Sequence, residues 1–228
     1  MTNFRKEREK MVGDLKSRGI TNQKVLGAFS EVPREYFVDD RYKDKAYADT
    51  PLPIGEGQTI SQPYTTAFMT QLLDLKGDER VLEIGTGSGY SSAILAKLGK
   101  EVYSVEIIPI LATKARQVLQ RLAIHNVTIK LSDGSVGLRE QAPFDAIAVT
   151  AGAPETPKPL IGQLAKGGRL VVPVGNNLTQ SMLRIIKEEG GIKMENHGAF
   201  RFVPLVGEFG WKLHRKGKTS RPIIFKEK

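Results

Sequence analysis

The sequence predicts an α/β protein with a doubly wound, mostly parallel sheet of the seven-stranded type, a helical N-terminal extension and an antiparallel C-terminal portion. Two observations predict this class. From residue 80 onward, short apolar runs alternate with segments of helical period, which indicates βαβ units with right-handed crossovers. A glycine-rich turn also joins the first apolar run to the helix that follows it, as is typical of open α/β sheets.

The first third of the chain predicts helices on either side of an irregular connection. Residues 3–18 and 22–30 carry apolar side chains at helical spacing. Residues 39–58 contain two prolines and two glycines near their end, so we expect a long irregular segment. Long segments of this kind often carry function. Pro63 then begins a further helix.

The remaining elements follow the alternation of apolar runs and helical periods. Strands are expected at residues 81–84, 101–106, 127–131, 144–150 and 168–174, and helices at 90–98, 109–122 and 157–165. Two later strands, at 182–186 and 192–202, are expected to run antiparallel. We expect one domain over 1–228, made of an N-terminal extension (1–75), a core (76–175) and C-terminal strands with a basic tail (176–228).

Composition excludes several classes of function. Of the 228 residues, 34 are Lys or Arg and 25 are Asp or Glu, which gives a formal charge of +9. The absence of cysteine excludes disulfide scaffolds, thiolate metal sites and cysteine nucleophiles. No apolar run could cross a bilayer and the N-terminal segment is charged, so we expect a cytoplasmic protein without membrane contact. We also expect a monomer and no metal site. The basic residues cluster near both ends without interleaved aromatics, which favours a solvated surface over a nucleic-acid site.

The glycine-rich turn is the first motif that indicates chemistry. It reads VLEIGTGSGY, and its GxGxG glycines allow a sharp turn and close approach of a ligand. Backbone amides at the start of the next helix suit a polar or negative group. Dinucleotide sites prefer GxGxxG, whereas GxGxG after an acidic residue resembles the first motif of S-adenosylmethionine-dependent methyltransferases. The candidate cofactor residues here are Glu83, Gly85, Thr86, Gly87 and Gly89.

Acidic residues end the next two strands. Glu106 follows Gly85 by 21 residues, a position from which an acid can bind both ribose hydroxyls of a nucleotide. Asp133, before Gly134, could bind an adenine amino group, although Asp-Gly is also a common turn pair. Because ligands of open α/β sheets bind at the carboxyl ends of strands, three such strand ends in succession favour a binding site that includes Asp133 and Gly134.

Six segments together resemble one family of methyltransferases. They are Gln58–Pro63 (QTISQP), Leu82–Tyr90, Val102–Ile107, Phe144–Pro154, Leu164–Gly175 and Arg201–Gly207 (RFVPLVG). From about residue 5 to about residue 212 the chain resembles the protein-L-isoaspartate (D-aspartate) O-methyltransferase family, which implies a Rossmann-like fold. The first and last of these segments are the most specific, and the basic tail after Trp211 has no counterpart in the pattern.

The resemblance implies the reaction and the remaining site residues. The methyl group of S-adenosylmethionine passes to the α-carboxylate of an L-isoaspartyl residue in a damaged protein or peptide, leaving S-adenosylhomocysteine. The ester then cyclises to a succinimide without the enzyme. In the family, the serine of the TIS segment lies where cofactor and substrate meet, and here it is Ser61, the implied catalytic residue. The further cofactor residues implied are Thr59, Ile60, Ile107 and Thr150. The implied substrate residues are Ser61, Ala151, Val203, Pro204 and Leu205.

Other interpretations stay open at this point. Ser61 could be the N-cap of the helix that Pro63 begins. Residues 201–207 could form an ordinary core strand, although Pro204 favours an edge or a loop. The alternatives for the whole protein are a methyltransferase of the same fold that acts on RNA or a small molecule, a nicotinamide-dependent oxidoreductase and a non-catalytic binding module. Fold alone does not decide among them.

Overall fold

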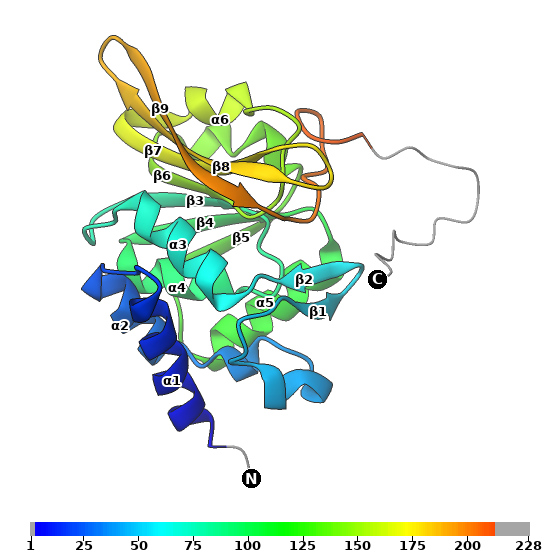
Figure 1. Ribbon diagram of the computed structural model, residues 1–228. Coiled ribbons are helices and arrows are strands. Elements are labelled where there is room, and N and C mark those ends of the chain that lie inside the picture. Colours follow the sequence, from blue (N-terminus) through cyan, green and yellow to red (C-terminus); the bar gives the residue numbers. More distant parts are fainter. Residues whose placement is uncertain (1–2, 213–228) are drawn as a thin grey trace, which may run out of the picture.

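The structure, a computed structural model, describes residues 3–212, and its centre is a seven-stranded sheet with the order β5-β4-β3-β6-β7-β8-β9 (Figure 1). The strands are β3 (Arg80–Ile84), β4 (Glu101–Glu106), β5 (Val127–Leu131), β6 (Phe144–Val149), β7 (Leu164–Gly175), β8 (Gln180–Glu188) and β9 (Gly191–Phe200). Strands β3 to β7 are parallel, whereas β8 and β9 run antiparallel to their neighbours. The predicted α/β class and the antiparallel C-terminal portion are therefore confirmed. The basic tail beyond Lys212 lies outside the described residues.

Helices cover both faces of the sheet. The helices α3 (Pro63–Leu73), α4 (Tyr90–Leu98) and α5 (Pro109–Arg121) share one apolar cluster with Val81 of β3. The next residue, Leu82, belongs to the cluster under α6 (Lys158–Gly162) on the opposite face, because successive strand residues point to opposite faces. No helix in the described part of the chain is long and apolar enough to cross a membrane.

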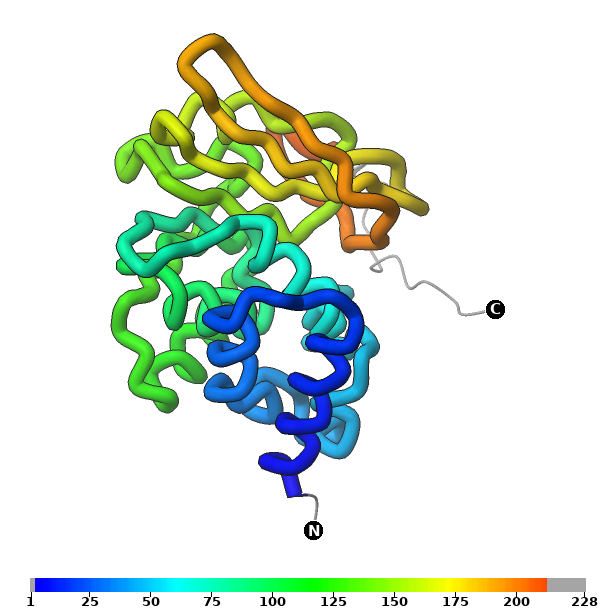
Figure 2. The backbone as a smooth tube through the Cα atoms, turned by 60° about the vertical axis from the view of Figure 1, so that its left-hand side comes forward, coloured from blue at the N-terminus to red at the C-terminus, as the bar shows by residue number. Residues whose placement is uncertain are grey.

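The N-terminal helices pack on the outside of this core. Helix α1 (Phe4–Ser17) contacts α2 (Gln23–Glu31), and α2 contacts α4. The ring of Phe29 in α2 meets the ring of Tyr90, the first residue of α4, edge to face at 5.9 Å. Figure 2 shows the blue N-terminal start of α1 at the opposite end of the molecule from the orange turn between β8 and β9.

The largest difference from the sequence prediction lies in residues 39–58. They contain a 3-10 helix (Asp40–Lys45) and the hairpin of β1 (Leu52–Gly55) and β2 (Gln58–Ile60). Glu56 and Gly57 form its two-residue turn, with φ of 53° and 69°, the backbone twist that suits a tight hairpin. The expectation of an irregular connection is therefore wrong for this part, because the prolines and glycines around the turn mask the short strand pattern.

The helix predicted at 157–165 is also too long. Helix α6 ends at Gly162, and β7 already begins at Leu164, which pairs with Phe144 at the start of β6. Gln163 between them is only 5% exposed. Leu164 leaves the helix because its backbone pairs with β6, a tertiary contact that apolar spacing along the sequence does not reveal.

Candidate functional site

The glycine-rich loop after β3 is held at the carboxyl edge of the sheet. Gly85 N donates to Val105 O at 2.8 Å, and Gly89 N donates to Thr86 O at 2.8 Å. Gly85 has a φ of +96°, and a Cβ there would lie 2.5 Å from Thr150 Oγ1, so only glycine fits without displacing Thr150. The same Oγ1 donates to Gly85 O at 2.7 Å. The structure thus places Thr150 against the glycine loop, and its role in cofactor binding stays a prediction.

The β1–β2 hairpin lies beside this loop. The Cδ1 atom of Ile54 in β1 would be 3.4 Å from a Cβ built on Gly87. At the end of the hairpin, Thr59 is exposed, Ile60 is buried and Ser61 is half-buried. The three residues that the family resemblance implies are therefore carried to the edge of the predicted cofactor loop.

Glu106, at the end of β4, binds backbone amides around the same loop. Its Oε2 accepts from Gly87 N at 2.8 Å, and its Oε1 accepts from the amides of Ile107 and Ile108, each at 2.9 Å. A carboxylate offers about four acceptor positions, so one remains for a ligand hydroxyl. Glu106 is 5% exposed, whereas the neighbouring Ile107 is 45% exposed and presents an apolar side chain to solvent.

Asp133 is a turn residue that also fastens the C-terminal segment. Its Oδ1 accepts from Ser135 N at 2.8 Å and Ser135 Oγ at 2.7 Å, which caps the short 3-10 helix Gly134–Val136. Its Oδ2 accepts from Glu208 N at 2.7 Å. Gly134 packs so closely that a Cβ there would lie 2.5 Å from Ile84 Cγ2. The turn role leaves one acceptor position on Oδ2, so the adenine contact stays a prediction.

Glu83 lies beneath the loop with no exposed surface. Its Oε2 accepts from the hydroxyls of Ser92 and Ser104, the latter at 2.6 Å. Its Oε1 has no hydrogen-bond partner among residues 3–212. Burial raises the pKa of the Glu83 carboxyl, because the cost of desolvating the charge outweighs the serine hydroxyls that bind it.

The predicted substrate residues pair with the turn that follows β6. Gly152 N donates to Val203 O at 2.7 Å, and Leu205 N donates to Gly152 O at 2.8 Å. The indole Nε1 of Trp211 donates to the same carbonyl at 3.0 Å. Pro204 forms an isolated bridge with Gly152 and belongs to no strand of the sheet, so the alternative of a core strand is wrong.

Gln180 supports this turn from β8 and was not predicted. It is 3% exposed, and its Oε1 accepts from Phe202 N at 2.8 Å. A Cβ on Gly152 would lie 2.9 Å from Gln180 Cδ, so the turn and the glutamine are in tight contact. Ala151 beside them is 8% exposed. Small residues therefore line the turn, as the sequence predicts.

Ser61 is positioned by its backbone rather than by its hydroxyl. The N-cap of α3 is Gln62 and makes no side-chain cap bond, so the N-cap interpretation of Ser61 is wrong. Ser61 O accepts from Nη2 of Arg34 at 2.8 Å. Sequence reasoning missed Arg34, because an arginine that follows a helix is usually a surface charge, whereas this one is completely buried.

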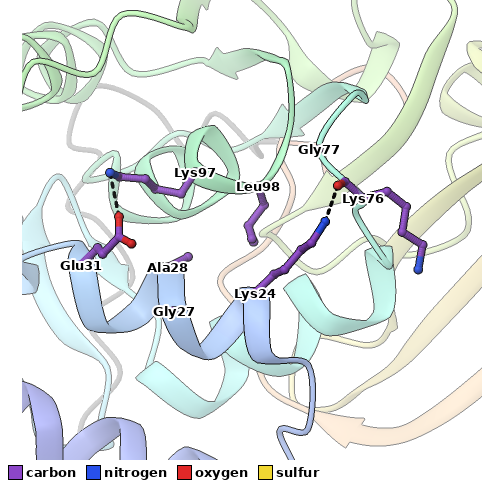
Figure 3. A pocket seen from close by; sticks show the side chains of 8 residues that line it. All are labelled: Lys24, Gly27, Ala28, Glu31, Lys76, Gly77, Lys97 and Leu98. Atoms are coloured by element: carbon purple, nitrogen blue, oxygen red, sulfur yellow. Dashed lines mark hydrogen bonds and ion pairs between the residues drawn. The ribbon is translucent and has the colours of Figure 1, made fainter.

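Two surface hollows of the described chain lie away from these residues. One lies between α2 and α4 and is lined by Lys24, Lys76 and Lys97 (Figure 3). Its lysines already have partners, since Lys24 Nζ donates to Lys76 O and Lys97 pairs with Glu31 at 2.9 Å. Within residues 3–212 no group of three or more His, Cys, Asp or Glu residues could hold a metal ion.

Known proteins match this chain over nearly its whole length. The family described as protein-L-isoaspartate(D-aspartate) O-methyltransferase matches residues 6–210. Protein-L-isoaspartate O-methyltransferase 1 of Syntrophobacter fumaroxidans is 53% identical over 93% of this chain and 100% of its own. Protein-L-isoaspartate O-methyltransferase of Geobacter metallireducens is 56% identical over 92% of this chain and 98% of its own.

Solved structures agree with the sequence relatives. A protein-L-isoaspartate O-methyltransferase superposes with a TM-score of 0.81 and 34% identity, over 89% of this chain and 67% of that one. A crystal structure from Plasmodium falciparum assigned to this enzyme, in complex with S-adenosyl-L-homocysteine, superposes with a TM-score of 0.77 and 28% identity, over 90% and 99%. With the family matched across residues 6–210, the chain belongs to the protein-L-isoaspartate(D-aspartate) O-methyltransferase family.

Proposed function

We propose that this chain transfers a methyl group from S-adenosylmethionine to the α-carboxylate of L-isoaspartyl residues in damaged proteins and peptides. The observation that carries the proposal is the meeting of four segments at one edge of the sheet. Gly87 of the glycine loop contacts the hairpin that ends near Ser61, Gly85 contacts Thr150, and Gly152 of the same turn pairs with residues 203–205. Each segment was expected to bind either the cofactor or the substrate.

The residues of this edge fit S-adenosylmethionine. When bound, the cofactor supplies an electrophilic methyl group on a positively charged sulfonium. The remaining acceptor position of Glu106 suits a ribose hydroxyl, and the exposed side chain of Ile107 offers an apolar surface beside it. The unpartnered Oε1 of Glu83 suits the ammonium group, because a buried acceptor without a donor is costly. The relative crystallised with S-adenosyl-L-homocysteine supports the same cofactor.

The remaining cofactor residues follow from the same placement. Asp133 keeps an acceptor position for an adenine amino group. Thr59 and Ile60, on the hairpin beside the glycine loop, would cover the cofactor. Thr150 would act mainly through the loop, whose Gly85 carbonyl its hydroxyl binds.

The substrate side is made of a hydroxyl and of backbone. Ser61 offers a hydroxyl on a half-buried side chain, and its carbonyl is bound by Arg34. Ala151 is a small residue on the turn after β6, and the backbone of residues 203–205 is bound to Gly152 of the same turn. Recognition of main chain suits an enzyme that must accept damage in many sequences.

The proposed chemistry needs no general base. A carboxylate with a pKa near 4 is already ionised at neutral pH, so its oxygen is ready to act as the nucleophile. The protein has to place this oxygen in line with the methyl group and to keep water away from it. A bidentate arginine would hold the charge tightly in the ground state, whereas the hydroxyl of Ser61 is a weaker clamp that leaves the oxygen reactive.

The test is a paired peptide assay. Purified protein is incubated with methyl-labelled S-adenosylmethionine and two peptides that differ only in carrying isoaspartate or aspartate at one position. We expect base-labile label on the isoaspartyl peptide alone. Absence of label from both peptides, with the cofactor still bound in a calorimetric titration, would reject the repair reaction and make RNA the next substrate to test.

The proposal extends to the state of the protein. We propose one domain over 1–228 that acts as a monomer in the cytoplasm. The contacts of α1 with α2 and of α2 with α4 support a single folding unit for the described part. Light scattering after size exclusion would test the monomer.

A further inference from the structure

Arg34 is the largest fully buried side chain of the described residues, and the proposed reaction does not use it. It begins the 3-10 helix Arg34–Tyr36 that follows α2. Burial lowers the pKa of its guanidinium through desolvation, but an arginine stays charged in proteins. A buried charge is costly to keep, so the contacts of this side chain are informative.

The guanidinium of Arg34 joins three separate segments. Its Nε donates to Ala46 O at 2.7 Å, and its Nη2 donates to Ser61 O at 2.8 Å. Its Cζ lies 4.8 Å from the ring centroid of Tyr90, the first residue of α4 and the neighbour of Gly89. The planar guanidinium therefore contacts both Ser61, which carries the candidate catalytic hydroxyl, and α4, the helix that follows the glycine loop.

The position of Tyr90 is fixed from the other side. The rings of Phe29 and Phe37 meet the Tyr90 ring edge to face at 5.9 and 5.5 Å. Burial raises the pKa of the Tyr90 hydroxyl to about 12, so this group stays neutral beside the guanidinium. Because these rings restrict Tyr90, the guanidinium that packs on it is also held in place, and so is the Ser61 carbonyl that it binds.

We propose that Arg34 is a positioning residue that sets the distance between Ser61 and the Gly85–Gly89 loop. The inference rests on the proposed function, because it assumes that Ser61 receives the substrate carboxylate and the loop receives the cofactor. The geometric tolerance of such a transfer is small, since a misplacement of about 1 Å can cost on the order of a hundredfold in rate. The planar fork of arginine can bind two carbonyls in fixed directions, which the single ammonium of lysine cannot do.

The test compares variants of two arginines that both bind backbone carbonyls. Arg34→Met keeps an unbranched apolar side chain in place of the arginine stem and removes both hydrogen bonds. Arg34→Lys restores the charge and one donor group. The control is Arg169→Met, because Arg169 in β7 binds Leu73 O at 2.9 Å and Asp74 O at 3.1 Å at the end of α3. Its Nη2 also pairs with Glu79 at 3.2 Å, and none of these partners belongs to the proposed site. Each protein is assayed for melting temperature, for kcat and KM with an isoaspartyl peptide, and for S-adenosylhomocysteine affinity by calorimetry.

We expect kcat of folded Arg34→Met to fall about a hundredfold, with partial recovery in Arg34→Lys. Arg169→Met should lose melting temperature but keep kcat within about twofold of the parent. If Arg34→Met does not fold, Arg34→Lys takes its place in the comparison. A folded variant of Arg34 that turns over as fast as the parent overturns the inference.

A double-variant cycle separates positioning from general stability. If Arg34 acts through Ser61, the Arg34 substitution should lower kcat only about tenfold in a Ser61→Ala background, because residues that act as a unit are not additive. Additive losses in kcat, with an active parent enzyme, would overturn the inference and leave the proposed function intact. A parent that methylates no isoaspartyl peptide would overturn both.

Discussion

The substitution Ser61→Ala tests the centre of the proposed site with little effect on the fold. It removes a hydroxyl on a half-buried side chain. The carbonyl that Arg34 holds is unchanged, and α3 still begins with Pro63 after the N-cap Gln62. Substitution of a partly exposed side chain of this kind changes the free energy of unfolding by about 0.5 kcal/mol or less. We therefore expect the same unfolding midpoint in urea.

The expected loss of activity is much larger. A hydrogen bond to a charged group contributes about 1.5–3 kcal/mol. Since each 1.36 kcal/mol of transition-state stabilisation corresponds to a factor of ten, kcat/KM should fall roughly 10- to 150-fold. The loss should appear with the isoaspartyl peptide and not in the affinity for S-adenosylhomocysteine, because the hydroxyl is assigned to the substrate.

The assay measures labelled methyl transfer under conditions where the parent and the variant are both folded. Ser17→Ala is a matched control, since Ser17 lies at the end of α1 and its hydroxyl donates to Asp14 O at 2.8 Å. The control should match the parent in kcat/KM. Two results would refute the assignment of Ser61: an unchanged kcat/KM, or a drop in the unfolding midpoint large enough to explain the whole loss of activity.

Three further predictions concern the residues around Ser61. Gly85→Ala should lower the unfolding free energy in urea by about 2–3 kcal/mol, from backbone strain and the displaced Thr150 hydroxyl, and adding Thr150→Ala should recover the part due to the clash. Burial raises the pKa of Glu83, so the parent loses stability as pH rises from about 4.3 through that raised pKa. The stability of Glu83→Gln relative to the parent should therefore be greater at pH 8 than at pH 5, and the variant should bind S-adenosylhomocysteine more weakly. A stability difference that does not change with pH would contradict this. Trp211→Phe removes the hydrogen bond to Gly152 O and should lower the free energy of unfolding in urea by about 1 kcal/mol. It should also raise the KM for the peptide, and an unchanged KM would show that Trp211 does not support the proposed substrate residues 203–205.

The parts of the proposed site that sequence reasoning could predict are those that directly follow a strand in the sequence. The glycine loop can be predicted because the positive φ angles at Gly85, Gly87 and Gly89 favour glycine. Glu106 is readable because it ends an apolar strand at a fixed spacing from that loop. In both cases the residues with a proposed role stand at the end of an apolar run that predicts a strand.

The parts that could not be predicted are side chains whose partners are distant backbone groups. Gln180 binds Phe202 N, and Arg34 binds Ser61 O across 27 positions of the chain. Carbonyls and amides occur at every residue, so no pattern in the sequence marks the one that is bound. The hairpin of residues 52–60 was missed for a related reason, because its register depends on the turn at Glu56 and Gly57 rather than on apolar alternation.

Asp133 has a structural role that still leaves an acceptor position for the proposed adenine contact. The sequence offered a turn or an adenine contact, and the structure shows the turn together with a bond to Glu208 N. That bond joins the proposed cofactor edge of the sheet to the segment that follows the proposed substrate residues 203–205. A residue that completes a turn is held rigidly, and a rigid carboxylate is what an orienting hydrogen bond to a ligand requires.

The charge of Arg34 reaches the proposed substrate carboxylate only indirectly. The Nε and Nη2 groups of the guanidinium bind the carbonyls of Ala46 and Ser61, and the plane lies near the Tyr90 ring, whereas Nη1 is buried without a hydrogen-bond partner among residues 3–212. A direct bidentate contact would stabilise the charged carboxylate before the reaction more than during it, because the negative charge is lost as the ester forms. With the arginine behind Ser61, its planar guanidinium positions the backbone of Ser61. The substrate carboxylate, which is the nucleophile, is then bound by the neutral hydroxyl of Ser61. The same reasoning explains why the substitution of Arg34 should act on kcat through Ser61 rather than on ground-state binding.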